Sequence, residues 1–337
     1  MNVYFRLTNS GSGANVIVHQ ISAALHDSNI HHETELLPQA LDMVPFITPL
    51  YKNRETSFDI VHGDVFTTFF KPSKPCLLTF HHVVHAKTVR YKTVTQRLYH
   101  LLLFYYEKRA LNNADIVVCP SHFTKRELER VFNYKSARVI YNGIDIDVFK
   151  PIDVSREKYG IPPEKTVLLF TGNLLKRKGA DLLPEIMSRL GDDFVLLLTS
   201  GMRKGREIKQ KNIISLGYVP FAKLPEIYNL CDIFLFPTRL EGFGYSVAEA
   251  MACAKPVVTT NCSALPELVS DEQSGFLCEK DNVDEYIARV RQLHQQKDRS
   301  RALGMAGRQK IIRDFSMEQM TKQYVAVYRE LTAQHLS

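Results

Sequence analysis

The sequence has no pair of cysteines at the CxxC spacing, although it contains six cysteines in 337 residues. Cysteines scattered through a large chain are typical of buried thiols in a reducing compartment, so we expect neither disulfides nor a cysteine-bound metal. Its longest apolar run, residues 98–106, is interrupted by His100, whereas a membrane-spanning helix needs about 18 to 20 apolar residues. The start, MNVYFRLTNSGSG, has no signal-peptide layout because Arg6 interrupts its apolar stretch. We therefore expect a cytoplasmic protein.

Low-complexity tracts and repeats of fixed period are absent as well. Hydrophobic residues make up 45% of the chain and charged residues 23%, which is ordinary globular composition and excludes a disordered or collagen-like chain. The length predicts about two domains. Lys and Arg number 43 against 36 Asp and Glu, a net charge of +7 that favours anionic partners. Nucleic acid, phosphorylated small molecules and anionic lipid all satisfy that preference.

Short apolar runs alternate with helical patterns along the chain, which predicts parallel sheets with helices on both faces, an α/β fold. The stretch 142–163, rich in Asn, Asp, Gly and Pro, is the expected linker between two doubly wound domains, residues 1–150 and 151–315. A closing helix is expected at 316–337. The predicted strands are Asn2–Leu7, Phe58–Val61, Cys76–His81, Asp115–Cys119 and Ala137–Tyr141, then Thr166–Thr171, Phe194–Thr199, Asn212–Gly217, Asp232–Phe236, Pro256–Thr260 and Gly275–Cys278.

The helices are expected near Ala14–His26, Val89–Asn112 and Phe123–Phe132, then from about Ala180, and at Arg301–Arg313 and Met317–Leu331. Open parallel sheets bind ligands at the carboxyl ends of their strands. Two facing sheets would therefore offer one shared cleft.

A first glycine cluster, Gly11-Ser12-Gly13, follows the first strand and opens a helix, where backbone amides favour an anion. With Glu33 about 20 residues further on, it resembles the dinucleotide-binding fingerprint, but Val16 stands where the third glycine belongs. A phosphate or substrate loop, an NAD or FAD site, and a purely structural turn are all consistent with this pattern.

A second cluster, GNLLKRKG at 172–179, follows the strand Thr166–Thr171 and contains Lys176, Arg177 and Lys178. Three successive cations at the carboxyl end of a strand suit a diphosphate. A solvated basic loop is the alternative.

The third cluster, EGFGYSVAEAMA at 241–252, follows the strand Asp232–Phe236. Its glycines let a ligand approach the backbone, and the helix that follows points its amides at phosphate oxygens. Glu241 and Glu249 flank the turn. Alternatively, Ser246 and Glu249 form a capping box, and Glu241 is a surface acid.

The Glu241-x7-Glu249 spacing, together with GNLLKRKG upstream, resembles retaining glycosyltransferase family 4. The resemblance implies the GT-B fold, in which two Rossmann-like domains face each other and a C-terminal helix crosses back to the first domain. The resemblance covers most of the chain. RALNNADIVVCPSHFTKREL, VIYNGIDIDVF, LPEIYNLCDIFLFPTRLEGFG and DFSMEQMTKQYVAVYREL are also typical of this family.

The resemblance implies transfer of a sugar from a UDP- or GDP-linked donor to a hydroxyl of a saccharide, lipid-linked or small-molecule acceptor. It implies that Glu241, Lys178 and His81 are catalytic, with His82 as the alternative histidine. Glu241, Gly242 and Phe243 would contact the sugar, while Glu249 and Tyr218 would bind the ribose and base. The donor diphosphate would be held by Gly13, Asn173, Arg177, Lys178, Phe243, Gly244, Tyr245 and Ser246.

One position departs from the family pattern: Asn173 stands where the family commonly has an arginine after the glycine. The diphosphate has then lost its usual bidentate partner. We expect Arg177 or Lys176 to supply the missing cation.

We expect no obligatory metal or other cofactor. Asp145-Ile146-Asp147 spells the DxD motif of a different glycosyltransferase fold, but it lies in the interdomain junction, and no HExxH pattern accompanies the histidines. Nucleic-acid binding is not expected either, because no basic motif interleaved with aromatics and no helix-turn-helix is present.

Residues 87–109 contain an aromatic and aliphatic run flanked by cations. This pattern favours a buried helix of the first domain. It also resembles an interfacial helix that contacts anionic lipid, which would place the protein peripherally at the inner face of the membrane. For the whole chain, an epimerase or phosphorylase of the same fold, or an NAD-dependent oxidoreductase, are the alternative functions.

Overall fold

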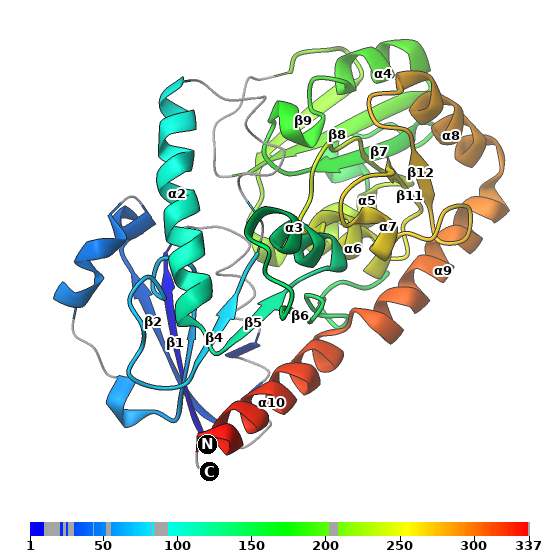
Figure 1. The fold of residues 1–337 in the computed structure, drawn as a ribbon. Helices are drawn as coiled ribbons and strands as arrows, with labels where there is room; N and C mark the ends of the chain where they lie inside the picture. Colours follow the sequence, from blue (N-terminus) through cyan, green and yellow to red (C-terminus); the bar gives the residue numbers. More distant parts are fainter. Residues whose placement is uncertain are drawn as a thin grey trace. The chain divides into compact units, whose positions relative to one another are not determined.

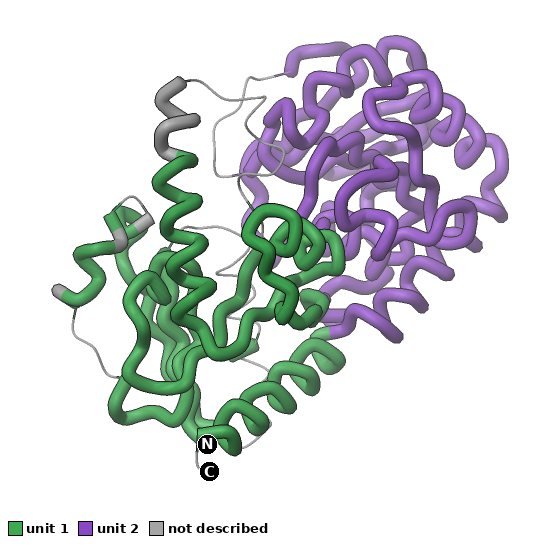
Figure 2. Tube along the Cα trace, in the orientation of Figure 1, with its two compact units in different colours: residues 1–143, 317–337 green, residues 144–316 purple. Residues whose placement is uncertain are grey.

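The protein was analysed as a computed structural model, which describes residues 1–9, 21–22, 25, 30–42, 44–51, 55–81, 83, 94–201 and 208–335. The chain forms two compact units (Figure 2). Unit 1 comprises Met1–Gly143 and Met317–Ser337, and unit 2 comprises Ile144–Ser316. Residues 144–150, expected in the first domain, belong to unit 2 because the Ile144 amide donates to the Phe315 carbonyl at 2.8 Å, beside a parallel bridge from Ile144 to Ser316.

Unit 1 is built on a six-stranded parallel sheet in the order β2-β1-β3-β4-β5-β6 (Figure 1). Its strands are β1 (Asn2–Thr8), β2 (His31–Leu37), β3 (Ile60–Gly63), β4 (Cys76–Thr79), β5 (Ile116–Cys119) and β6 (Arg138–Val139). Its described helices are α2 (Val94–Asn113), α3 (His122–Phe132) and α10 (Met317–Gln334), with short 3-10 helices at Gln39–Asp42, Pro45–Leu50 and Glu55–Ser57. Strand β2 was not predicted, because its sequence HHETELL is polar and lies at the half-exposed edge of the sheet.

Helix α10 belongs to unit 1, where it covers the sheet through two buried tyrosines. The Tyr328 hydroxyl lies 2.7 Å from Nδ1 of His62 on β3, and Thr79 on β4 lies 2.6 Å from its Nε2 and 3.2 Å from the Tyr324 hydroxyl. Burial lowers the pKa of His62 to about 3, so this histidine is neutral in the folded chain. A polar network thus joins the last helix to the middle of the first sheet.

Unit 2 contains a second six-stranded parallel sheet, in the order β12-β11-β10-β7-β8-β9 (Figure 1). Apolar residues fill the central strands, because helices cover both faces of the sheet. The strands are β7 (Thr166–Thr171), β8 (Phe194–Ser200), β9 (Ile213–Tyr218), β10 (Ile233–Phe236), β11 (Val257–Thr260) and β12 (Phe276–Cys278). The helices are α4 (Leu183–Leu190), α5 (Leu224–Leu230), α6 (Tyr245–Ala252), α7 (Leu265–Leu268), α8 (Val283–Gln295) and α9 (Lys297–Asp314), with 3-10 turns at Glu157–Tyr159, Lys176–Lys178 and Phe221–Lys223.

Every predicted strand is present, with ends within two residues of those expected. Strand β4 ends at Thr79, so His81 follows the strand. The helix expected from Ala180 begins at Leu183, after a single 3-10 turn at Lys176–Lys178. The helix predicted near Ala14–His26 lies almost wholly outside the described residues, as do Val89–Thr93 of the next one. No helix in the described part of the chain is long and apolar enough to span a membrane.

Candidate functional site

The loop after β7 packs tightly against the segment that follows β10. Gly179 closes the 3-10 turn with a left-handed φ of 74°, and a Cβ there would overlap the carbonyl oxygen of Pro237. Only glycine fits such a position. The Arg239 amide also donates to the Arg177 carbonyl at 2.8 Å, and the Thr238 hydroxyl oxygen lies 3.2 Å from the same carbonyl.

Arg239 anchors the 3-10 turn at Lys176–Lys178. Its guanidinium donates to the Lys176 carbonyl and binds the carboxylates of Asp181 and Asp281, each at 2.6 Å. The side chain is only 6% exposed. Sequence reasoning missed this residue, because its acidic partners lie 42 and 58 positions away and carry no local spacing signal. Arg239 therefore fixes the backbone that presents Lys178.

Lys178 and Glu241 meet at the carboxyl edge of the sheet. The Lys178 Nζ lies 2.5 Å from Oε1 of Glu241, which also accepts a hydrogen bond of 3.0 Å from the Thr238 hydroxyl. Nη1 of Arg177 lies 4.0 Å from the same carboxylate and donates to the Leu240 carbonyl at 2.6 Å. The Lys178 Nζ also lies over the Phe236 ring, 5.3 Å from its centroid, in a cation–π contact. The Glu241 side chain is buried, so it is not a surface acid.

This cluster holds two cations and one carboxylate. Burial raises the pKa of Glu241, but the charges of Lys178 and Arg177 outweigh it, and the resulting pKa lies below its ordinary value. Burial and the charge of Arg177 lower the pKa of Lys178 against the opposing charge of Glu241. The cluster therefore keeps a positive surplus that a multiply charged anion would neutralise.

Helix α6 begins beside this cluster. Its N-cap is Gly244, with φ 109°, where a Cβ would lie 2.8 Å from Cδ2 of Leu265. Glycine has no side chain that could cap the first turn, and the N-terminus of a helix favours an anion. Because the helix begins at Tyr245, Ser246 lies inside it, and the capping-box interpretation is wrong. Phe243 packs its ring 6.1 Å from that of Phe315.

Glu249 lies one turn further along α6 and is half-buried. The Tyr228 hydroxyl donates to its Oε2 at 2.6 Å and lies 2.9 Å from Oγ1 of Thr171 at the end of β7. Burial raises the pKa of Glu249 to about 7, against the opposing effect of the Tyr228 hydrogen bond. Tyr228 could not be predicted as a partner of Glu249 from local sequence, because it lies on the separate helix α5.

Asn173 and Tyr218 lie on the other side of β7. A Cβ on Gly201 would overlap the carboxamide of Asn173, so that side chain lies against the end of β8. Strand β9 ends in register with β8, with Tyr218 opposite Ser200. The Tyr218 side chain is 59% exposed. The carboxyl ends of β7, β8, β9 and β10 thus lie at one edge of the sheet in unit 2.

Comparison with known proteins identifies the family. The profile described as "Glycosyl transferases group 1" matches residues 151–310, and the profile described as "Glycosyltransferase Family 4" matches residues 23–148. The chain belongs to glycosyltransferase family 4. An uncharacterized glycosyltransferase of Methanocaldococcus jannaschii is 31% identical over 234 residues, 68% of this chain and 63% of that protein. The chain thus spans less than two thirds of that relative's length.

Solved structures show the same fold at low sequence identity. Sucrose-phosphate synthase from Thermosynechococcus elongatus superposes with a TM-score of 0.85 at 19% identity, covering 99% of this chain and 100% of that one. Anabaena HepE, solved with UDP and glucose, gives a TM-score of 0.78 at 17% identity, covering 98% and 100%. The predicted GT-B fold is confirmed.

The remaining residues assigned from the family-4 resemblance lie in unit 1. His81 follows β4 and is half-buried. Gly13 and His82, like the whole Gly11–Gly13 loop, lie outside the described residues. In the DxD tripeptide, Oδ1 of Asp145 accepts the backbone amides of Asp147 and Val148, each at 3.0 Å. Among the described residues no group of three His, Cys, Asp or Glu side chains is arranged to hold a metal.

Proposed function

We propose that this family-4 chain transfers a sugar from a nucleotide-diphosphate sugar, UDP- or GDP-linked, to a hydroxyl acceptor with retention at the anomeric carbon. The observation that carries the proposal is the cluster of Lys178, Arg177 and Glu241 beside the uncapped start of α6. Its surplus positive charge and the positive end of the α6 dipole match a diphosphate.

Each ligand part has a matching group at this edge. Lys178 and the amides after Gly244 hold the diphosphate. Asn173 stands where the family commonly has an arginine, and Arg177 supplies the missing cation. The Glu241 carboxylate accepts hydrogen bonds from sugar hydroxyls beside the Gly242–Phe243 backbone. Glu249 accepts hydrogen bonds from the ribose hydroxyls, and the exposed Tyr218 ring stacks on the base. The complex of HepE with UDP and glucose supports a UDP-linked donor as the first to test.

The chemical step breaks the bond between the anomeric carbon and the diphosphate oxygen, and the electron pair leaves with the diphosphate. The acceptor hydroxyl attacks the same face of the oxocarbenium-like sugar, and its proton passes to a leaving-phosphate oxygen. Lys178, Arg177 and the α6 amides stabilise the charge that develops on the leaving group. With this fixed positive charge in place, we propose that transfer needs no divalent metal, and activity is expected to persist in EDTA.

The acceptor is proposed to be a saccharide, a lipid-linked sugar or a small molecule, with His81 among the groups that face it.

A thermal-shift panel of UDP-, GDP- and ADP-sugars tests the donor assignment. A ligand at about 100 times its Kd stabilises the folded state by about 2.7 kcal/mol, so one base is expected to stand out. The panel is repeated with Lys178→Ala, in which the shift should shrink, and with Lys176→Ala, whose exposed side chain makes no contact with Glu241. Equal shifts in both variants would contradict the assigned diphosphate site.

Product analysis tests the reaction class. With donor and a panel of hydroxyl acceptors, proton NMR of the anomeric signal should show the donor's configuration in the product. Inversion would contradict retention. Release of free sugar or a change of sugar stereochemistry without an acceptor would instead indicate an epimerase or a hydrolytic enzyme.

We also propose peripheral contact with an anionic membrane at the inner face. On α2, Leu101, Leu102 and Tyr105 are 68%, 49% and 52% exposed, close to Lys108 and Arg109 near the end of the helix. Exposed apolar groups beside cations are the composition of an interfacial helix. Co-sedimentation with vesicles of phosphatidylglycerol at low salt should be lost in Leu101→Asp/Leu102→Asp; absence of wild-type binding would contradict the proposal.

A further inference from the structure

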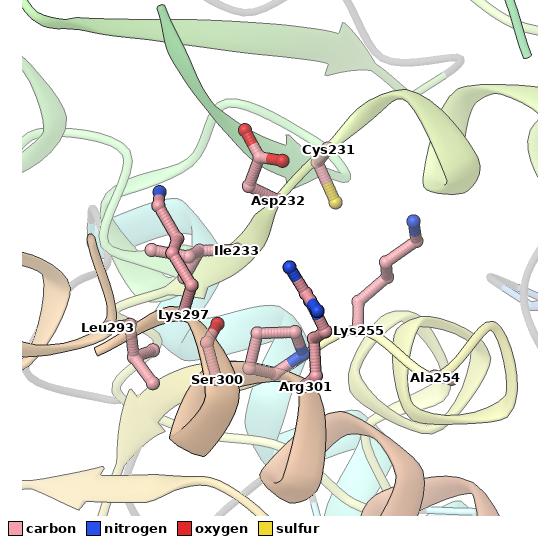
Figure 3. Close-up of a pocket in the computed structure, with 10 residues that line it drawn as sticks. Cys231, Asp232, Ile233, Ala254, Lys255, Leu293, Lys297, Ser300 and Arg301 are labelled. Atoms are coloured by element: carbon pink, nitrogen blue, oxygen red, sulfur yellow. The ribbon is translucent and has the colours of Figure 1, made fainter. Parts of the chain in front are cut away.

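A cavity lies in unit 2, at the opposite edge of the sheet from the proposed donor site. It has a volume of about 290 Å³ and is lined by the residues that precede β10 and β11 and by the start of α9 (Figure 3). Strand β10 runs from Ile233 at the cavity to Phe236 beneath Lys178. At about 3.3 Å per residue, the two places lie about 10 Å apart along this strand. The cavity is therefore separate from the diphosphate site proposed above.

Three cationic side chains surround this cavity: Lys255, Lys297 and Arg301 (Figure 3). Within the described part of the chain, Lys297 makes no ion pair. Arg301 pairs with Asp298 at 3.8 Å, and because both side chains are largely exposed this pair contributes little. Lys255 donates only to the Asn229 carbonyl, at 3.2 Å. The cavity thus holds positive charge that local acids do not neutralise.

The carboxylate that lines the cavity does not alter this balance. Asp232 is occupied by groups outside the cavity: Nη2 of Arg156 donates to Oδ1 at 2.7 Å, and the Val167 amide donates to Oδ2 at 2.8 Å. With its charge compensated by Arg156, Asp232 leaves the three cations in excess.

Helix α9 adds backbone donors to the same cavity. It is 18 residues long, and its N-cap Gln296 makes no side-chain capping bond. Lys297, Ser300 and Arg301 line the cavity, so the positive end of the helix dipole lies beside it. In the first turn, Ser300 is 8% exposed and lines the cavity, and its hydroxyl forms no hydrogen bond with any residue that the structure describes. The Ser300 hydroxyl oxygen is not fully buried, so it can bond a ligand or water that enters the cavity.

We propose that this cavity is a binding site for a small phosphate monoester. The phosphate would accept hydrogen bonds from the Ser300 hydroxyl and the α9 amides and pair with Lys297 and Arg301. The volume is near the lower limit of about 300 Å³ for small-molecule sites, which leaves room for an organic group beside the phosphate. Ile233 and Leu293 supply apolar surface for that group.

Isothermal titration with ribose 5-phosphate at low ionic strength tests the site, with inorganic phosphate and ribose as comparison ligands. Lys297→Ala/Arg301→Ala should weaken binding at least tenfold. Ser300→Ala, a milder change that should not disturb folding, should weaken it about tenfold, because it removes a hydrogen bond to a charged group. The control Lys322→Ala/Arg329→Ala removes two exposed cations from α10 and should bind within twofold of wild type.

Lys178→Ala separates the two anion sites and should also bind ribose 5-phosphate within twofold of wild type. Loss of binding in that variant would overturn the proposal, because the probe would then occupy the donor site. Wild-type-like affinity in both cavity variants, or no binding by the wild type, would overturn it too. Equal affinity for inorganic phosphate would overturn the assignment to a monoester.

Discussion

Lys178 and Glu241, 63 positions apart in the sequence, share a hydrogen bond of 2.5 Å at the carboxyl edge of the second sheet. Each belongs to a loop that follows a buried parallel strand, β7 or β10, and the two strands are neighbours. Arg177 adds a second cation 4.0 Å from the same carboxylate. The pair is thus a product of topology, and its single carboxylate moderates a site with two cations.

Removing the carboxylate should separate binding from catalysis. In Glu241→Gln the two cations lose their counter-charge, so affinity for a nucleoside diphosphate should rise, while transfer should fall at least tenfold, about 1.4 kcal/mol in transition-state stabilisation. In Lys178→Ala both affinity and transfer should fall at least tenfold. Titration calorimetry and initial rates measure the two effects. Transfer within tenfold of wild type in both variants would refute the catalytic roles assigned to them.

Arg239 should prove to be a positioning residue. Arg239→Ala leaves Asp181 and Asp281 without their shared partner and releases the Lys176 carbonyl, so the unfolding free energy should fall by about 1–3 kcal/mol. Because the Lys178 turn loosens, kcat should fall as well.

Urea unfolding and initial rates give both numbers for Arg239→Ala. Arg189→Ala, which breaks an exposed ion pair with Asp284, is the matched control and should cost no more than about 1 kcal/mol. A stability loss with unchanged kcat would show that Arg239 is structural only.

Much of this organisation could be predicted from local sequence, because buried parallel strands are continuous apolar runs. The edge strand β2 could not be predicted in this way, since its sequence HHETELL contains no continuous apolar run. Ser246 and Glu249 have the spacing of a capping box, yet the left-handed Gly244 starts the helix two residues earlier. That starting point is set by packing against Leu265, a contact that sequence spacing does not encode.

In the candidate site, too, local sequence predicts some residues and not others. The cations of GNLLKRKG and the carboxylates of EGFGYSVAEA could be read locally because they lie in two short motifs. The partners that hold them could not: Arg239 joins acids from two other segments, and Tyr228 reaches Glu249 from α5. Long-range side-chain pairs depend on how strands are ordered in the sheet, which hydrophobic periodicity alone does not specify.

Glu249 should make stability depend on pH in an unusual direction. Its pKa is raised to about 7 in the folded chain, so between about pH 4.5 and 7 the folded state holds a proton that the unfolded state has released. Stability from this group is therefore lost as pH rises through that range. This loss should be absent in Glu249→Gln. The unfolding free energy of the variant should therefore differ between pH 5 and pH 8 by about 1–3 kcal/mol less than that of the wild type.

Guanidinium unfolding at pH 5 and pH 8 measures this difference. The exposed Glu164→Gln serves as the control and should track the wild type at both pH values. A wild type and a Glu249→Gln variant with parallel pH profiles would show that Glu249 titrates normally.

His62 should act in the opposite direction, in unit 1. Its pKa is lowered to about 3 in the folded chain, whereas in the unfolded chain it takes up a proton below about pH 6.5. Stability from neutral His62 is therefore lost progressively as pH falls from about 6.5 toward 3. His62→Gln can still bond Tyr328 and Thr79 but does not titrate, so its unfolding free energy should fall less steeply between pH 7 and pH 4. Urea unfolding at each pH checks this, with the exposed His335→Gln expected to follow the wild-type slope; equal slopes for all three chains would show that His62 is not the group responsible.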